Sequence, residues 1–209
     1  VLKPLKVVIE NFPEGRIEWL PALNNPNSDK QEQREIPFSR EIWIEQDDFM
    51  EEPSKKFFRL APGKEVRLRY AFFVTCNAVI KDEDGEIVEL RCSYDPKTRG
   101  GNAPDGRKVK GTIHWVSAEH AEDAEIRIYN SFYNTPSPGR ERDFIEDINP
   151  NSLEVLENCK IEPDLITLDD NVPIQFERLG YFYKDPDTTP EKHIYNRTIS
   201  LRDTWNKKL

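Results

Sequence analysis

Two arginines two residues apart, Arg67 and Arg69, are the side chains in this sequence best suited to binding chemistry. On a β-strand, residues i and i+2 project from the same face, roughly 6.6 to 6.8 Å apart along the chain. Each guanidinium offers a planar fork of donors that can bind a phosphate or a nucleobase edge. Arg59 follows Phe57 and Phe58, so an arginine also stands beside rings on which bases can stack. These residues predict nucleic-acid recognition; the structural alternatives are pairing with nearby acids and burial of a phenylalanine.

The charge of the chain is unevenly distributed. The 209 residues include 39 acids and 30 basic residues, and the net charge of −9 by itself argues against binding nucleic acid. Residues 55–70 nevertheless carry six basic side chains against one acid, and residues 97–110 carry five against one. Acids concentrate in residues 41–52 and 140–170. Such segregation can create a positive face on an acidic protein, although charged runs also commonly just face solvent.

Catalytic and metal-binding patterns are missing from the sequence. His114, His120 and His193 lie far apart and form no zinc motif with the three cysteines. Glycine-rich phosphate loops and a nucleophile elbow are also absent. We therefore expect a non-catalytic chain without a metal site. The odd cysteine count favours a reducing compartment and argues against an extracellular, disulfide-bonded sandwich.

Apolar and polar residues alternate along much of the chain, which predicts β-strands. Only 36% of residues are hydrophobic and 16 are proline, so we expect the strands to be short and joined by many turns. No apolar stretch approaches the length of a membrane span, and no helix longer than about three turns is expected. Hairpin turns are predicted at residues 11–15 and at Asp82–Gly85, where Asp-Gly suits positive φ. The expected strands cover residues 6–10, 17–20, 35–45, 65–80, 86–94, 107–117, 125–129, 153–156, 174–183 and 193–201. This pattern predicts an all-β barrel or sandwich class, and the length favours two small barrels.

Five blocks of sequence strongly resemble the C-terminal anticodon-binding region of bacterial-type glutaminyl-tRNA synthetase. The blocks are KVVIEN at residues 6–11, Arg59-Leu60 with GKEVRLR at 63–69, DGRKVKGTIHWVS at 105–117, QFERLGYF at 175–182 and NRTISLRDTW at 196–205. They occur in order, and the resemblance runs from Val1 to Trp205. It implies two β-barrels of the ribosomal L25-like type, approximately residues 1–110 and 111–209, with strand exchange between them left open. Because the chain starts with Val, we expect it to have been either processed or cut from a longer protein.

The resemblance assigns three arginines to the outer anticodon positions. Arg59 matches the arginine that reads the third base, and Arg67 and Arg69 match the pair around the first base. Two neighbours depart from the family pattern. Phe58 stands where a basic residue is usual, so a phosphate contact is expected to be lost or replaced by stacking, and Lys56 stands where a glutamine is often found.

Further residues are assigned by the same resemblance. Gln175, with Glu177 and Arg178, matches the block that reads the central uridine. Asn27 matches, more weakly, an asparagine near the end of the anticodon stem. An arginine that helps to hold the central base in the family would lie upstream of Val1.

The resemblance also implies a function in protein biosynthesis. The parent enzyme would be a cytoplasmic aminoacyl-tRNA synthetase, a ligase that joins glutamine to its tRNA using ATP with Mg. This sequence lacks the catalytic domain with its HIGH and KMSKS-like signatures, so no cofactor is expected in the fragment. The expected partners are the tRNA for glutamine and the N-terminal catalytic domain, in a monomer without membrane contact. Two alternatives stay open: the barrel region of an archaeal or eukaryotic-type glutamyl-tRNA synthetase, and a non-synthetase RNA-binding protein on the same barrel.

Overall fold

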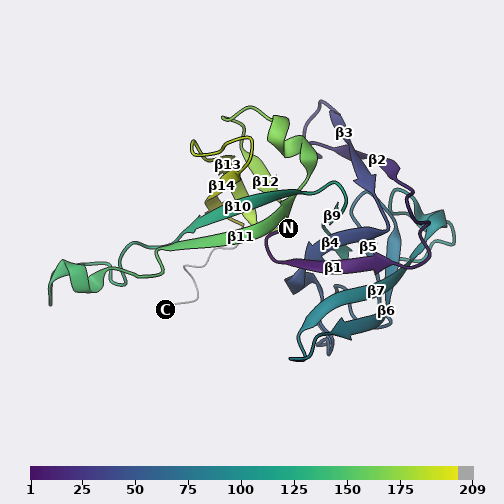
Figure 1. The fold of residues 1–209 in the computed structure, drawn as a ribbon, viewed down its shortest axis with the longest axis horizontal. Helices are drawn as coiled ribbons and strands as arrows, with labels where there is room; N and C mark the ends of the chain where they lie inside the picture. Colours follow the sequence, from purple (N-terminus) through teal and green to yellow (C-terminus); the bar gives the residue numbers. More distant parts are fainter. Residues whose placement is uncertain (202–209) are drawn as a thin grey trace. The chain divides into compact units, whose positions relative to one another are not determined.

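The protein is nearly all β. The computed structural model describes residues 1–201 (Figure 1). By its contacts the chain divides into two compact units: Val1–Glu122 with Lys160–Leu165 form the first, and the second comprises Asp123–Cys159 and the residues after Leu165. These observations confirm the all-β class, whereas the L25-like type and the domain boundary near residue 110 stay predictions.

Helical structure within residues 1–201 is limited to short 3-10 segments. They are η1 (Gln46–Asp48), η2 (Pro96–Thr98), η3 (Phe144–Asp147) and η4 (Pro163–Thr167). In this part of the chain, no helix is both long and apolar enough to cross a membrane. The sequence motif at residues 196–205 extends past Leu201, so its last four residues lie outside the described part.

The first unit contains a seven-stranded sheet that nearly closes on itself. Its strands, in spatial order, are β8 (Thr112–Ile113), β5 (Glu65–Leu68), β6 (Phe73–Lys81), β7 (Ile87–Asp95), β1 (Pro4–Ile9), β4 (Glu41–Glu45) and β9 (Trp115–Ser117). The two edge strands, β8 and β9, are separated in the chain by His114 alone. Opposite edges of the sheet must therefore meet, which makes it a nearly closed barrel. A separate ribbon consists of β2 (Glu18–Leu23) and β3 (Gln33–Phe38).

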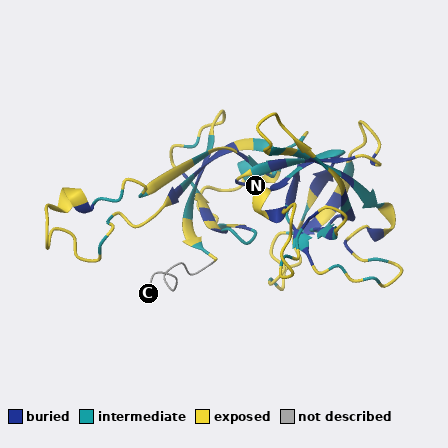
Figure 2. Ribbon diagram, turned by 90° about the horizontal axis from the view of Figure 1, so that it is seen from below, coloured by how far each residue is buried: buried dark blue, intermediate teal, exposed yellow. Residues whose placement is uncertain are grey.

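Aromatic side chains fill the core of the first unit. Phe38 is fully buried, and its ring centroid lies 5.0 Å from Phe12, 5.1 Å from Phe72 and 5.2 Å from Trp115. Tyr94 packs on the same cluster. Edge-to-face contacts of this kind add to the stabilisation from burial alone. The dark-blue strand segments of Figure 2 mark this buried interior.

The second unit is a five-stranded sheet. Its spatial order is β11 (Leu153–Ile161), β10 (Glu122–Tyr129), β14 (His193–Ser200), β13 (Gly180–Lys184) and β12 (Ile174–Phe176). Figure 1 shows β10 and β11 running side by side as a ribbon whose connecting segment extends beyond the sheet. That segment is mostly exposed (Figure 2). Phe176 stacks on Phe182 at 4.2 Å and anchors the other side of the sheet.

Pairing partners differ from two of the sequence-based expectations. The turn at residues 11–15 does not join a hairpin: β1 pairs antiparallel with β4 and parallel with β7, while β2 pairs with β3. The reason is that Ile9 donates a hydrogen bond to the Arg40 carbonyl and Phe12 is buried in the core, so the chain leaves the sheet there. The predicted strand over residues 35–45 is in fact two strands with different partners, because β3 pairs with β2 and β4 pairs with β1.

Turns interrupt two other predicted strands, and a third begins later than predicted. Residues 65–80 form β5 and β6, joined by a tight turn in which Leu68 donates to the Phe72 carbonyl at 2.8 Å and Tyr70 has a φ of 62°. Residues 174–183 form β12 and β13 around a turn in which Arg178 has a φ of 64°. Residues 107–111 are outside any strand. The turn at Asp82–Gly85 is confirmed, since Gly85 has a φ of 84° and donates to the Asp82 carbonyl.

We predict that Phe38→Ala destabilises the protein by about 3 to 5 kcal/mol, because it leaves a large cavity between three aromatic rings. Thermal and denaturant unfolding followed by circular dichroism measures the effect. Ile80→Ala is the control: this side chain is 41% exposed, and its truncation should change stability by roughly 0.5 kcal/mol or less. Equal effects of the two substitutions would contradict the assignment of the core.

Candidate nucleic-acid interface

Arg67 is held on β5 with its side chain packed between a ring and a glycine. Its backbone N–H donates to the Gly111 carbonyl at 2.9 Å, and its guanidinium carbon lies 5.4 Å from the Phe73 ring centroid. A Cβ at Gly101 would lie 2.8 Å from the Arg67 Cδ, so a larger residue there would displace the arginine side chain. The buried Nε of Arg67 makes no hydrogen bond within residues 1–201. A buried donor without an acceptor costs free energy, so the packing of Arg67 is not optimised for the stability of the fold alone.

Arg107 explains why nearby acids do not neutralise Arg67. The Arg107 guanidinium binds both carboxylate oxygens of Glu65 at 3.0 Å, and it also pairs with Asp95 and Asp105. Glu65 stands two residues before Arg67 on β5 and is the acid nearest to it in sequence on that strand. Because Arg107 binds this carboxylate, no ion pair to Arg67 occurs within the described residues. The charge of Arg67 therefore stays available for a ligand.

Arg69 lies in the turn just after β5. Its N–H donates to the Ile113 carbonyl, its own carbonyl accepts the Trp115 indole N–H, and each distance is 3.0 Å. These bonds hold the backbone of Arg69 against β8 and β9 at the start of the turn. The Arg69 guanidinium packs over the Tyr70 ring at 5.6 Å.

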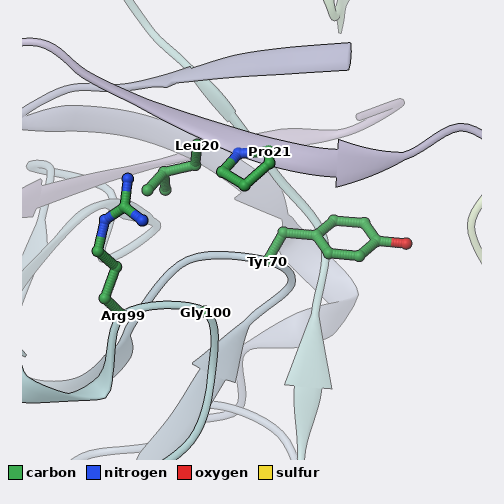
Figure 3. A pocket seen from close by; sticks show the side chains of 5 residues that line it. All are labelled: Leu20, Pro21, Tyr70, Arg99 and Gly100. Atoms are coloured by element: carbon green, nitrogen blue, oxygen red, sulfur yellow. The ribbon is translucent and has the colours of Figure 1, made fainter. Parts of the chain in front are cut away.

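A pocket of about 210 Å³ lies beside this turn, lined by Leu20, Pro21, Tyr70, Arg99 and Gly100. Figure 3 shows Arg99 and Tyr70 on opposite sides of the pocket, with Leu20 and Pro21 above them. The Arg99 Nε donates to the carboxylate of Glu18 at 2.8 Å, which fixes the guanidinium against the β2 strand.

Phe58 and Lys110 form an exposed pair next to β5. Phe58 is 51% exposed, and the Lys110 ammonium lies 4.9 Å from its ring centroid. The following residue, Gly111, passes so close that a Cβ there would lie 1.9 Å from the Phe58 carbonyl oxygen. Since Gly111 also bonds to Arg67, these contacts place Phe58, Lys110 and Arg67 in one region of the first unit.

Arg59 has partners of its own. Its Nη1 donates to the Asp47 carbonyl at 2.8 Å and lies 3.2 Å from the carboxylate of Asp48, which is buried. The structural alternative considered for the arginines, pairing with a nearby acid, therefore applies to Arg59. Its side chain remains 26% exposed, and a guanidinium has five N–H donors, so further contacts are possible.

The residues predicted to read the central base lie around one hairpin of the second unit. Gln175 on β12 is exposed and faces Tyr181 across the ladder, while its neighbour Phe176 is buried. Glu177 and Arg178 are half-buried in the turn that follows. This alternation anchors the hairpin through the phenylalanine and turns the amide of Gln175 outward.

Asn27 lies elsewhere in the first unit, in the loop between β2 and β3. It is exposed, and its N–H donates to the Asn25 side-chain oxygen at 3.0 Å in a local turn.

The sequence alone did not identify three residues that position Arg67: Gly101, Phe73 and Arg107. The run of basic residues at 97–110 was a signal for this segment but did not identify the partners.

The part of the chain that the structure describes contains no group of three or more His, Cys, Asp or Glu side chains arranged to hold a metal. The polar groups of the first unit instead present arginine donors, a lysine and an exposed ring. This arrangement is typical of surfaces that bind single-stranded nucleic acid.

Comparison with protein families agrees with this chemistry. Residues 1–95 and residues 112–185 each match a family model described as "tRNA synthetases class I (E and Q), anti-codon binding domain". The chain belongs to this family of anticodon-binding domains, and the resemblance seen in the sequence is confirmed.

The individual relatives that the chain resembles are glutamine–tRNA ligases. The chain is 59% identical over its full length to a glutamine–tRNA ligase of Bradyrhizobium diazoefficiens, and 56% identical over 99% of its length to that of Nitrobacter winogradskyi. It is 52% identical over 98% of its length to the glutamine–tRNA ligase of Aliivibrio salmonicida. The chain spans 37% of the length of each of these relatives.

We predict that the carboxyl of Asp95 titrates below its ordinary pKa of 3.8, because Arg107 and then the Lys97 N–H bind its charged form. A pKa lowered by folding stabilises the folded state above the unfolded pKa, and this contribution is lost as the pH falls through the folded value. Carboxyl ¹³C NMR measures the midpoint. Arg107→Gln should raise it, and an unchanged midpoint in this variant would contradict the role of Arg107.

Proposed function

We propose that this chain is the anticodon-binding region of a glutamine–tRNA ligase and that it reads the anticodon of the tRNA for glutamine. The observation that carries the proposal is the agreement between the family match and Arg67, a half-buried arginine that makes no ion pair within the described residues. Specific RNA recognition generally uses splayed, unstacked bases whose edges meet Arg and Gln side chains and whose faces meet aromatic rings. The first unit offers the arginines and a ring, and the second offers Gln175.

In this proposal Arg67 and Arg69 bind around the first anticodon base and Arg59 the third. Arg67 supports this role because the residue is only half-buried and makes no ion pair within the described residues, so a base or phosphate oxygen can accept from its terminal N–H groups. Arg59 would keep its contact with Asp48 and use its remaining N–H groups. The ion pair fixes the direction of the guanidinium and so favours one geometry of approach.

Gln175, Glu177 and Arg178 are proposed to bind the central uridine. The support is the outward-facing amide of Gln175 on a hairpin anchored by Phe176. An amide group supplies both a donor and an acceptor, which matches the edge of a uracil ring. Asn27 is proposed to contact the end of the anticodon stem from its exposed loop.

The activity of the whole protein is part of the proposal. The full-length relatives are named glutamine–tRNA ligases, so we propose that the longer protein joins glutamine to tRNA with ATP and Mg in an N-terminal catalytic domain. It would act in the cytoplasm, where translation takes place, as a monomer. This chain would supply tRNA binding rather than chemistry.

A glutamyl-tRNA synthetase is the second candidate, because the matching family description covers both E and Q enzymes. The relatives named above favour glutamine. Binding of purified glutamine tRNA and glutamate tRNA to the same chain distinguishes the two. Tighter binding of glutamate tRNA would overturn the proposed specificity.

We predict that Arg67→Ala and Arg69→Ala each weaken binding of glutamine tRNA by about 1 to 3 kcal/mol, the range for loss of a base-reading arginine. Filter binding at low salt measures the dissociation constants. Arg91→Ala is the matched control, because Arg91 lies on β7 and its Nε pairs with Glu89 at 2.7 Å. If both variants bind like wild type, and an altered anticodon changes nothing, the assignment of the site is wrong.

Phe58 generates a separate prediction about salt dependence. Phe58→Ala should weaken tRNA binding by about 1 to 3 kcal/mol through lost base stacking, with an unchanged slope of affinity against salt. Phe58→Lys should instead steepen that slope by about one, because a new phosphate contact releases a counterion. Phe132→Ala, at a ring 57% exposed in the second unit, is the control. Equal slopes for Phe58→Lys and wild type would contradict a backbone contact at this position.

A further inference from the structure

Two cysteines face each other across the wall of the first unit. Cys76 on β6 and Cys92 on β7 are direct partners in the antiparallel ladder, and both are free and buried. Directly opposed residues on neighbouring strands project their side chains to the same face of a sheet. Both thiols therefore point into the core side by side.

The backbone hydrogen bonds show which kind of cross-strand pair this is. The Cys76 carbonyl accepts from Gly63 at 2.8 Å and its N–H donates to the Lys64 carbonyl at 3.4 Å, both away from β7. The Cys92 carbonyl accepts from Glu10 at 2.8 Å, on the far side of β7. Because neither residue uses these groups to bond the other, Cys76 and Cys92 form a non-hydrogen-bonded pair.

A non-hydrogen-bonded pair has the geometry that a disulfide needs. Opposed Cα atoms in such pairs are about 4.5 Å apart, and their side chains lie closer than in the hydrogen-bonded type. Disulfides span Cα separations of roughly 4.4 to 6.8 Å. The two sulfurs can thus bond without moving the strands apart.

We propose that Cys76 and Cys92 are an oxidation site at which a peroxide converts two buried thiols into a cross-strand disulfide. The Cys76 sulfur attacks a peroxide oxygen, the O–O bond breaks, and a sulfenic acid forms with release of water. The Cys92 sulfur then attacks the Cys76 sulfur, the S–O bond breaks, and the hydroxide leaves with the Cys92 proton as a second water. Two thiols have lost two electrons and two protons, and hydrogen peroxide has become two waters.

The thiols differ in a way that fits this order of attack. The Cys92 S–H donates a hydrogen bond to the Cys76 sulfur, which lowers the pKa of Cys76 and raises that of Cys92; burial also raises the Cys92 pKa. The thiolate is the reactive form of a cysteine, so Cys76 is the first nucleophile and Cys92 the resolving thiol.

A defect in the ladder provides access to the buried pair. The register of β6 against β7 shifts between Cys76 and Ala78, leaving Asn77 as the extra residue of a bulge. Asn77 and Ala78 are both exposed, directly next to Cys76. Local opening at an interrupted ladder requires less free energy than opening a continuous one, which lets a small oxidant reach the sulfur.

The test is to treat the 209-residue chain with hydrogen peroxide, alkylate the remaining thiols and map the products by non-reducing peptide mass spectrometry. The chain contains three cysteines, so we expect the free thiols to fall from three to one and a peptide pair joining Cys76 to Cys92 to appear. Dithiothreitol should restore all three thiols. This proposal does not depend on RNA binding.

Serine variants of each cysteine show which thiols form the bridge. Cys159→Ser, on β11 in the second unit, is the matched control and should still form the bridge. Cys76→Ser and Cys92→Ser should each abolish it, with folding checked by circular dichroism. The peptide map of the unmodified sequence decides the matter even if a variant fails to fold. Three unreacted thiols, overoxidation of Cys76 without a bridge, or a bridge that includes Cys159 would each overturn the proposal.

Discussion

The binding of Arg107 to three carboxylates is the interaction on which the candidate interface depends. It connects the loop after β7, the start of β5 and the end of β7 through Asp105, Glu65 and Asp95. Its guanidinium also lies 5.3 Å from the Phe73 ring, whose surroundings it shares with Arg67. Arg107 therefore has a structural role in which its charge is neutralised by carboxylates, whereas the charge of Arg67 is not neutralised by an ion pair within the described residues. Arginine suits this position because its planar fork can bind several carboxylates at fixed angles, which a lysine cannot do.

The two units present their candidate residues by different means. In the first unit, glycines permit close packing: Gly101 lies against the Arg67 side chain and Gly111 against the Phe58 carbonyl. In the second unit, a buried Phe176 anchors a hairpin whose exposed neighbour is Gln175. Both the glycine contacts and the Phe176 anchor hold a polar side chain on a rigid strand or turn. Less conformational entropy is then lost when a ligand binds.

The sequence predicted those features of the fold that depend on neighbouring residues alone, namely the buried face of a strand and a tight turn. Alternation placed Val66 and Leu68 in the core, and the Asp-Gly signal located the turn that ends at Gly85. Strand pairing was less accessible, because nothing near β2 in the sequence shows that its partner is β3 rather than β1. The turn at Arg178 was missed because a positive φ usually signals glycine, and here a long charged residue adopts it. The roles of Arg67 and Arg69 came from family resemblance, whereas the Glu65–Arg107 pair spans 42 residues and required the fold.

Closure of the sheet in the first unit has a consequence for association between molecules. Exposed edge strands offer unpaired N–H and C=O groups that can recruit further strands and seed aggregation. Here the edges are β8 and β9, only two and three residues long and joined through His114. The row of free backbone groups is correspondingly short. The first unit, whose arginines and exposed ring are proposed to bind tRNA, thus offers only a short sheet edge to which a second molecule could add a strand.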